Sequence, residues 1–234
     1  MADRRFDAVL FDLLTALLDS WTLWNSIAGS KENGQNWRTA YLRRTYETGA
    51  YRPYETLVAE AATEVGLSPM LAFALALRYG ELKPWPEVGE VLGALRSSGL
   101  ALGVVTNCSE ELGARAVACT GIEFDVAVTA ERIGYYKPDP RPYTVALTEL
   151  GVAPSRCLFV AGSAYDLFGT GNLGLPTYWH DRVGMMPPVG VPTPIAHHRS
   201  LYPLLDVVPG ELMQRQPAEA LANWTMRFGT AKRI

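Results

Sequence analysis

The sequence predicts an α/β protein: a doubly wound, Rossmann-like parallel sheet forms the core, and a helical cap domain is inserted into it. Three apolar runs that end in polar residues are typical of buried strands, over residues 6–12, 101–107 and 157–166. Strands of a parallel sheet are covered by helices on both faces, so they are near-continuous apolar runs. Helical patterns lie between these runs, over residues 87–98, 109–119 and 140–150. Alternation of strands with helices indicates a doubly wound domain.

The composition is that of an ordinary soluble globular protein. Of its 234 residues, 48% are apolar and 19% are charged, and the formal net charge of −3 predicts no nucleic-acid partner. The first apolar run is short and is interrupted by Asp7 and Asp12, so we expect neither a signal peptide nor a membrane span. The three cysteines, Cys108, Cys119 and Cys157, have no C-x-x-C spacing. This sparse set favours a reducing, cytoplasmic location and no structural zinc.

Residues 19–85 interrupt the alternation with a helical pattern rich in aromatic, alanine and leucine residues. Pro84 and Pro86 end this segment in a stiff, extended stretch, because proline cannot continue a helix. We therefore predict a core domain made of residues 1–18 and 86–234. Residues 19–85 would form a cap domain that covers the strand ends as a lid. An alternative stays open, in which these helices belong to one continuous domain.

Two further segments carry weaker expectations. Residues 183–194 are rich in proline, glycine and valine and predict a loop. Residues 211–234 predict a C-terminal helix with a basic end and no evident chemical role.

Polar residues at the ends of the apolar runs predict one active site. In open α/β sheets, ligands bind at the carboxyl ends of the strands. Asp12 ends the first run, Thr106 and Asn107 end the second, and Asp166 follows the third. Lys137 lies in a turn bounded by prolines, where its position should be well defined. We expect these side chains to meet at one edge of the sheet.

Two carboxylates and a lysine in one pocket suggest catalysis by a carboxylate nucleophile. Asp12 alone is weak evidence, because an acid after a strand can serve as a helix cap. Two acids that share a pocket repel each other, which raises the pKa of one of them. A lysine between Asp12 and Asp166 would remove that repulsion and keep Asp12 ionised as a nucleophile.

Five short motifs appear in an informative order: Phe11-Asp12-Leu13-Leu14-Thr15-Ala16-Leu17-Leu18-Asp19, Trp37-Arg38, Thr106-Asn107, Tyr136-Lys137-Pro138-Asp139 with Tyr143 six residues after the lysine, and Phe159-Val160-Ala161-Gly162-Ser163-Ala164-Tyr165-Asp166. Each motif is weak evidence on its own, but their common order is strong evidence. The chain resembles the haloacid dehalogenase superfamily in these residues, and within it the L-2-haloacid dehalogenase branch. The resemblance covers nearly the whole chain up to about residue 205.

The resemblance implies a metal-free hydrolase without a cofactor. Asp12 would displace a substituent from the α-carbon of a small 2-substituted carboxylic acid and form an ester. Lys137 would neutralise the acids, and Asp166 with Ser163 would position the water that cleaves the ester. The leading expectation is a 2-haloacid dehalogenase.

The same resemblance assigns the substrate contacts. Arg38, Asn107 and Tyr165 would cradle a leaving halide, since a guanidinium, an amide and an aromatic edge stabilise a departing anion. The substrate carboxylate would bind the hydroxyl of Thr106 and backbone N–H groups near Leu13 and Leu14. Tyr143 joins the substrate site through its position after the lysine.

Structural roles are the alternative for several of these residues. Arg38 could be a solvated residue on a helix surface, and Asn107 could only cap the helix that follows it. Tyr143 and Tyr165 could be packed aromatic residues whose hydroxyl groups are satisfied elsewhere.

Departures from the family pattern argue against a phosphatase. Phosphatases of the superfamily carry a second acid two residues after the nucleophile, where this chain has Leu14, which cannot exchange a proton. Ser163 replaces one of the acids that hold their magnesium, and a hard cation wants several oxygen ligands. Other departures concern the branch itself: its first motif has Gly-Thr where this chain has Thr15-Ala16, and its fourth motif reads Phe-Val-Ser-Ser-Asn-Ala-Trp-Asp.

These altered motifs leave two other functions open. One is the hydrolytic ring opening of azetidine-2-carboxylate by the same mechanism, which breaks a carbon–nitrogen bond. Arg38 argues against it, because a guanidinium repels a protonated ring nitrogen. The other is a catalytically silent binding protein that kept the fold. The oligomeric state is also open, with a homodimer as one alternative.

Overall fold

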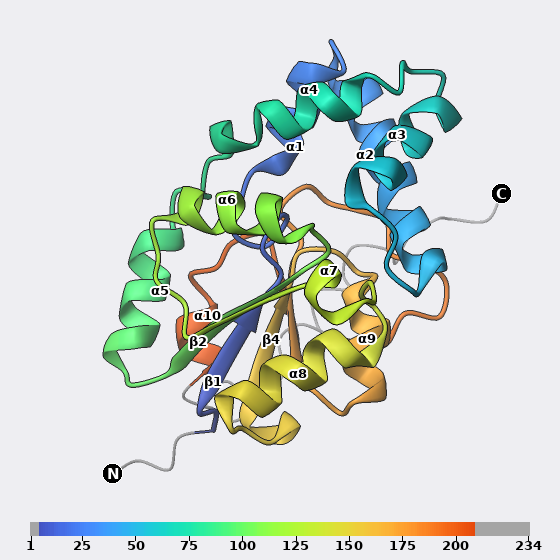
Figure 1. Cartoon of the computed structure of the whole chain (residues 1–234). Coiled ribbons are helices and arrows are strands. Elements are labelled where there is room, and N and C mark those ends of the chain that lie inside the picture. The colour runs from blue at the N-terminus through green and yellow to red at the C-terminus, as the bar shows by residue number, and fades with distance from the viewer. Residues whose placement is uncertain (1–4, 209–234) are drawn as a thin grey trace, which may run out of the picture.

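A parallel sheet forms the centre of the chain in the computed structural model, which describes residues 5–208. Within these residues the sheet has six strands, in the order β3-β2-β1-β4-β5-β6 (Figure 1). Their bounds are β1 (Ala8–Phe11), β2 (Ala101–Thr106), β3 (Val126–Thr129), β4 (Cys157–Ala161), β5 (Thr177–His180) and β6 (Ala196–His198). β1 lies between β2 and β4, and Phe11 is opposite both Val104 and Val160. The predicted doubly wound parallel sheet is confirmed.

Helices cover both faces of the sheet, so the side chains of the central strands β1, β2 and β4 alternate between two cores (Figure 1). Val9 and Phe11 of β1 belong to the core under α5, α6 and α10. Ala8 and Leu10 belong to the core under α8 and α9. Every position of β1 can therefore be apolar, which explains the continuous apolar run. The bounds are α5 (Val88–Ser97), α6 (Glu110–Thr120), α7 (Ala130–Ile133), α8 (Pro140–Leu150), η2 (Pro154–Arg156), α9 (Asp166–Asn172) and α10 (Leu204–Val207).

The helices between β1 and α5 gather at one end of the sheet (Figure 1). They are α1 (Ser20–Ile27), α2 (Lys31–Thr48), α3 (Tyr54–Glu64), α4 (Leu71–Leu77) and the short η1 (Tyr79–Glu81), and we call them the inserted helices. The chain enters and leaves them along one path, because Asp19 N donates to Lys83 O (2.8 Å) and Trp85 N donates to Leu17 O (2.9 Å). The division of the chain at residues 18/19 and 85/86 stays a prediction.

Aromatic residues make up much of the interior of the inserted helices. Trp24 and Trp37 are fully buried with their ring centroids 4.4 Å apart, and Trp37 Nε1 donates to the carbonyl of Val58 (2.8 Å). Tyr41 packs against Trp24 and against Tyr54. This cluster continues without a break into the core under α5 and α6. The inserted helices are thus packed onto the sheet through shared apolar contacts.

Glycine and serine residues determine where α2 begins and how closely it packs against α1. Gly29 adopts a φ of +79° in the preceding turn, and the side chain of Ser30 accepts from Asn33 N (3.1 Å) as the N-cap. A Cβ atom on Gly34 would lie 2.3 Å from the side chain of Asn25, so glycine allows α1 and α2 to approach closely. This close contact fixes how α1 and α2 pack against each other.

Several elements differ from the sequence-based expectations. Three strands were not predicted, β3, β5 and β6, and all lie toward the edges of the sheet. The segment between β5 and β6 carries no helix or strand, as predicted for residues 183–194. The helix predicted for 211–234 lies outside the described residues. Among the described helices, none has both the length and the apolar character needed to cross a membrane.

Candidate active site

Asp12, Lys137 and Asp166 meet at the carboxyl edge of the sheet, as the strand ends predict. Asp12 follows β1, Lys137 lies between α7 and α8, and Asp166 begins α9. The Nζ atom of Lys137 lies 2.8 Å from Oδ1 of Asp12 and 3.0 Å from Oδ1 of Asp166. All three side chains are buried. The lysine therefore bridges two acids in a place that water hardly reaches.

Burial and neighbouring charges shift the pKa values of the two acids in opposite directions. Burial raises the pKa of Asp12, but the charge of Lys137 and hydrogen bonds from Lys137 and Thr15 outweigh burial and leave this pKa below its usual value. Burial raises the pKa of Asp166 to about 6, because the pull of Lys137 compensates burial only in part and the charge of Asp12 adds to the rise. Burial lowers the pKa of Lys137, but both acids raise it above its usual value overall. Asp12 is thus ionised and Lys137 is charged at neutral pH.

Second contacts hold this group of residues in place. Tyr143 is fully buried, and its hydroxyl donates to Oδ1 of Asp166 (2.9 Å). Asn107 binds the backbone of Lys137 twice: its Nδ2 donates to the carbonyl (3.2 Å) and its Oδ1 accepts from the amide (2.7 Å). A Cβ atom on Gly169 would lie 2.5 Å from Pro138 O, so α9 packs tightly against the loop that carries the lysine. The position of Lys137 is therefore fixed from several sides.

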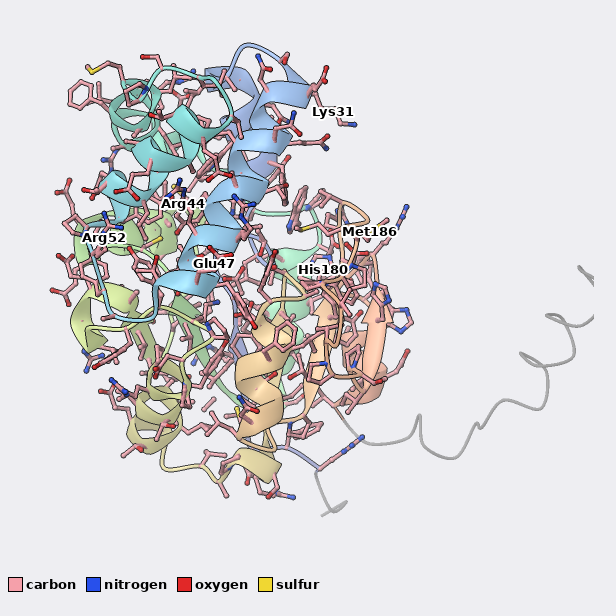
Figure 2. The ribbon with its side chains drawn as sticks, turned by 90° about the vertical axis from the view of Figure 1, so that its right-hand side faces the viewer. Lys31, Arg44, Glu47, Arg52, His180 and Met186 are labelled. Carbon is pink, nitrogen blue, oxygen red and sulfur yellow. The ribbon has the colours of Figure 1, made fainter. Side chains whose placement is uncertain are left out.

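Arg38 brings a second positive charge to the site, from α2. Its side chain is only 1% exposed, and its Nε and Nη1 atoms are buried without a hydrogen-bond partner. The guanidinium carbon lies 5.1 Å from the ring centroid of Trp21 and 5.0 Å from that of Trp24. Figure 2 shows α2 running from Lys31 down to Glu47, where it reaches the sheet domain. The alternative of a solvated Arg38 is wrong, because the chain folds this face of α2 onto the strand ends.

A buried guanidinium without an acid partner favours an anion beside it. Transfer of a charge from water into a protein interior is costly unless the charge is paired. Lys137 already has two acids, whereas no salt bridge to Arg38 is present among the described residues. The site therefore offers an unpaired cation on the side of the inserted helices. Such an arrangement suits a bound anion or a group that becomes one.

A pocket between the inserted helices and the sheet contains most of the predicted site residues. It is lined by Asp12, Leu14, Thr15, Arg38, Tyr41, Leu42, Thr45, Tyr46, Asn107, Lys137, Ser163, Tyr165 and Asp166. Its free volume is small, about 30 Å³. Tyr46 of α2 lies 5.1 Å from Tyr165 and 5.4 Å from Phe168, measured between ring centroids. Aromatic rings from both parts of the protein thus meet at this pocket.

Three predicted substrate residues do not line the pocket. The hydroxyl of Thr106 donates to Sγ of Cys108 (3.3 Å) and is buried behind the site. The side chain of Leu13 belongs to the apolar core, and Tyr143 lies under Asp166. The expected role of Leu13 concerned its backbone N–H, and that role stays a prediction. The assignment of the Thr106 hydroxyl to a substrate carboxylate is therefore not supported, since that hydroxyl faces a sulfur atom. Tyr143 instead helps to hold Asp166 in place through its hydrogen bond to Oδ1.

The cap alternative for Asn107 is also resolved. The side chain of Ser109 accepts from Leu112 N (3.4 Å) and caps α6. Asn107 is thus free to hold Lys137. Burial raises the pKa of the neighbouring Cys108 thiol to about 11, so this cysteine is a poor nucleophile.

One contact of Asp12 was missed by the sequence analysis. Its Oδ2 atom accepts from Thr15 N (2.8 Å), from Thr15 Oγ1 (2.5 Å) and from Ala16 N (3.2 Å). The signal in the sequence was a threonine at a position where the related motif has glycine. It indicated an altered turn but not the direction of the hydroxyl.

The donor set does not favour a divalent metal. Over residues 5–208, no group of three or more His, Cys, Asp or Glu side chains is placed to hold one. The ammonium of Lys137 occupies the position between the two acids, and Leu14 and Ser163 add no charge. A hard cation would need several oxygen ligands that these residues do not supply.

Comparisons with known proteins agree with this geometry. A family model described as haloacid dehalogenase-like hydrolase matches residues 6–169. The chain is similar to (S)-2-haloacid dehalogenase 4A of Burkholderia cepacia, with 34% identity over 133 residues, which span 54% of this chain and 57% of that protein. It is 30% identical to (S)-2-haloacid dehalogenase 1 of Pseudomonas sp. (strain CBS-3) over 192 residues, which span 75% of this chain and 85% of that protein. A crystal structure of an L-2-haloacid dehalogenase superposes with a TM-score of 0.76 at 26% identity, covering 87% of this chain and 98% of the other.

Proposed function

This chain belongs to the haloacid dehalogenase-like hydrolases, and we propose that it hydrolyses the carbon–halogen bond of a small 2-haloacid through an ester of Asp12. The observation that carries the proposal is the pairing of an ionised, buried Asp12 with an unpaired, buried Arg38 across one pocket. A carboxylate supplies the nucleophile, and a guanidinium stabilises the halide that leaves. The names of the similar proteins support this substrate class.

In the first step, a carboxylate oxygen of Asp12 attacks the α-carbon of the substrate. The new bond is a carbon–oxygen ester bond, and the carbon–halogen bond breaks with its electron pair on the halide. The pocket offers Arg38 to that halide in a poorly hydrated place, where a charge is stabilised more strongly than in water. Lys137 keeps Asp12 ionised before the attack.

In the second step, water attacks the carbonyl carbon of the ester. Asp166 takes a proton from this water, and the 2-hydroxy acid leaves as the carboxylate of Asp12 is restored. A pKa of about 6 suits a general base that works near neutral pH. Lys137 and Tyr143 both bind Oδ1 of Asp166, and no hydrogen bond to Oδ2 is found in the described part of the chain. The second oxygen is thus available to the water.

The alternatives have less support. Ring opening of azetidine-2-carboxylate would place a protonated nitrogen beside Arg38, and none of the relatives named above carries that activity in its name. A silent binding protein would have no need of a buried nucleophile, a bridging lysine and a base. All three cysteines are free thiols, which favours a cytoplasmic location.

The test compares halide release with two competing reactions. The purified protein is incubated with (S)- and (R)-2-chloropropionate, azetidine-2-carboxylate and a phosphate monoester, each with and without EDTA. We expect chloride release from the (S) acid that EDTA does not change, and a loss of at least about 10⁴-fold in kcat for Asp12→Asn. Phosphate release that EDTA abolishes and magnesium restores would contradict the proposal. The absence of a reaction with any of these compounds would also contradict the proposal.

A further inference from the structure

The two carboxylate oxygens of Asp12 have different surroundings. Within residues 5–208, Oδ1 accepts one hydrogen bond, from Lys137. Oδ2 accepts three, two from Thr15 and one from the amide of Ala16. A carboxylate has about two lone-pair sites on each oxygen. Oδ2 is therefore saturated, whereas Oδ1 keeps a free electron pair.

We propose that these oxygens have separate tasks: Oδ1 attacks the substrate, and Oδ2 becomes the oxyanion of the ester-hydrolysis step, stabilised by the hydroxyl of Thr15. The proposal rests on the proposed function and adds a catalytic residue to it. Oδ1 would carry the substrate carbon in the ester, so Oδ2 would be the carbonyl oxygen. The three donors on Oδ2 would then face the atom on which negative charge develops.

The step balances as follows. The oxygen of water forms a bond to Cγ of Asp12 while Asp166 takes a proton, and the carbonyl electron pair moves to Oδ2. The pair then returns and the bond between Cγ and Oδ1 breaks. The product alkoxide takes back the proton that Asp166 holds, and the new acid at Asp12 loses its proton to solvent. Donors placed before the reaction at such an oxyanion are worth about 10²–10³-fold in rate each.

The fold makes room for the Thr15 hydroxyl by a glycine on the neighbouring strand end. A Cβ atom on Gly162 would lie 2.2 Å from Thr15 Oγ1 and 2.3 Å from Ala16 N. The related motifs have glycine at the position of Thr15 and serine at the position of Gly162. The hydroxyl and the glycine have thus exchanged places across this contact. The position of the Thr15 hydroxyl depends on Gly162, because a side chain at position 162 would occupy the space of that hydroxyl.

The third donor is held in place by a buried histidine. His180, at the end of β5, makes a hydrogen bond from Nδ1 to the carbonyl of Ala16 (2.8 Å) and is 0% exposed. A carbonyl accepts, so Nδ1 carries the proton. Figure 2 labels His180 near the loop that follows β5. This bond holds the turn after Asp12 at the carbonyl of Ala16, while Gly162 packs against its amide.

The test separates the two chemical steps in Thr15→Val, which removes the hydroxyl but keeps the shape, and in Thr15→Ser, which keeps the hydroxyl. Rapid-quench chloride release from (S)-2-chloropropionate reports the first step. Intact-mass measurement of the quenched protein reports the ester. For Thr15→Val we expect a chloride burst of about one per site at close to the wild-type rate, followed by turnover about 10²-fold slower or more, with the ester accumulating on Asp12. Thr15→Ser should restore turnover to within about tenfold.

Two results would overturn the proposal, and each differs from the result expected. If Thr15→Val slows the chloride burst as much as turnover and no ester accumulates, Thr15 acts only on the ionisation or orientation of Asp12, and the proposal is wrong. Unchanged turnover in Thr15→Val would also overturn it. If the wild-type protein releases no halide from any haloacid, the proposed function fails, and the role of Thr15 fails with it. A Thr15→Val protein that does not fold leaves the decision to Thr15→Ala, measured in the same way.

Discussion

The ammonium of Lys137 lies 2.8 Å from Oδ1 of Asp12, and this buried contact joins two loops that are 125 residues apart in the chain. The same nitrogen lies 3.0 Å from Asp166. One cation thus balances two acids, only one of which has a lowered pKa. This asymmetry separates a nucleophile from a base at a single bridging residue.

Replacement of Lys137 by methionine should abolish activity and destabilise the fold. Asp12 and Asp166 would then be buried without a counter-charge, so at least one would take up a proton at neutral pH. We expect kcat to fall by at least about 10³-fold and the free energy of unfolding at pH 7 to fall by about 3 kcal/mol. Urea denaturation and chloride release measure the two effects. Retention of more than a tenth of the activity would mean that the ion pair does not control Asp12.

The pKa of Asp166 predicts how activity depends on pH. Burial raises this pKa to about 6, and the base must be ionised to accept a proton from water. The rate of ester hydrolysis should therefore rise with pH and level off above about 7. Asp166→Asn should lose about 10²–10⁴-fold in that rate and show no step near pH 6. A profile that stays flat from pH 5 to 8 in the wild type would contradict the role of Asp166.

The same shift has a consequence for stability with the opposite sign. The pKa of Asp166 lies above its value of 3.8 for a solvated acid, so the folded protein holds the proton more tightly than the unfolded chain. The contribution of Asp166 is favourable at low pH and is lost as pH rises through about 6. Asp166→Asn should remove this loss. Compared with the wild type, its free energy of unfolding should fall less between pH 4 and pH 7 in urea denaturation.

The central part of the fold could be predicted because its strands are buried on both faces. β1, β2 and β4 are almost continuously apolar for that reason. The other strands leave weaker patterns: β3 has four residues with an exposed Ala127, and β6 has three, two of which are exposed. β5 is buried throughout, but it carries a threonine and a histidine whose polar groups bind neighbouring segments. Such partners are set by tertiary structure and leave no periodic signal.

The site was predictable in its charges and less so in its hydrogen bonds. Asp12, Lys137 and Asp166 follow from strand ends and a rigid turn. The directions of the Thr106 and Thr15 hydroxyls depend on turn geometry and on a glycine at position 162, which no local pattern encodes. Arg38 could not be told from a surface arginine, because the face of α2 that is buried depends on how the inserted helices pack on the sheet.

Stereochemistry tests the sequence of steps. One displacement at the α-carbon inverts that centre, and the ester is then cleaved at the acyl carbon of Asp12 without touching it. (S)-2-chloropropionate should therefore give (R)-lactate, which chiral chromatography detects. Direct attack by water on the α-carbon would also invert, so the reaction is repeated for a single turnover in oxygen-18 water. The label should appear in the protein, and label in the product would contradict the ester.

We expect Arg38 to lower the stability of the protein without a bound anion and to be required for activity. Its guanidinium is buried with two unpartnered nitrogen atoms, so the fold carries a desolvated charge that no acid of the described residues pairs with. Arg38→Met should raise the free energy of unfolding by about 1–2 kcal/mol in halide-free buffer, because methionine fills much of the space without a charge. Added bromide should raise the melting temperature of the wild type, since a ligand that binds only the folded state stabilises it. It should not do so in Arg38→Met.

A matched control lies six residues further along the same helix. Arg44 is half-buried and pairs with Glu60 and Glu64 rather than lining the pocket, so Arg44→Met should keep both the bromide effect and the activity. In Arg38→Met, kcat for chloride release should fall by at least about 10²-fold, and Arg38→Lys should recover little, because an ammonium does not reproduce the planar fork. The loss should be larger for chloro than for bromo substrates, since the poorer leaving group needs more stabilisation of its charge. Equal and small losses on both substrates, with a bromide effect that survives in Arg38→Met, would show that the halide leaves elsewhere in the pocket.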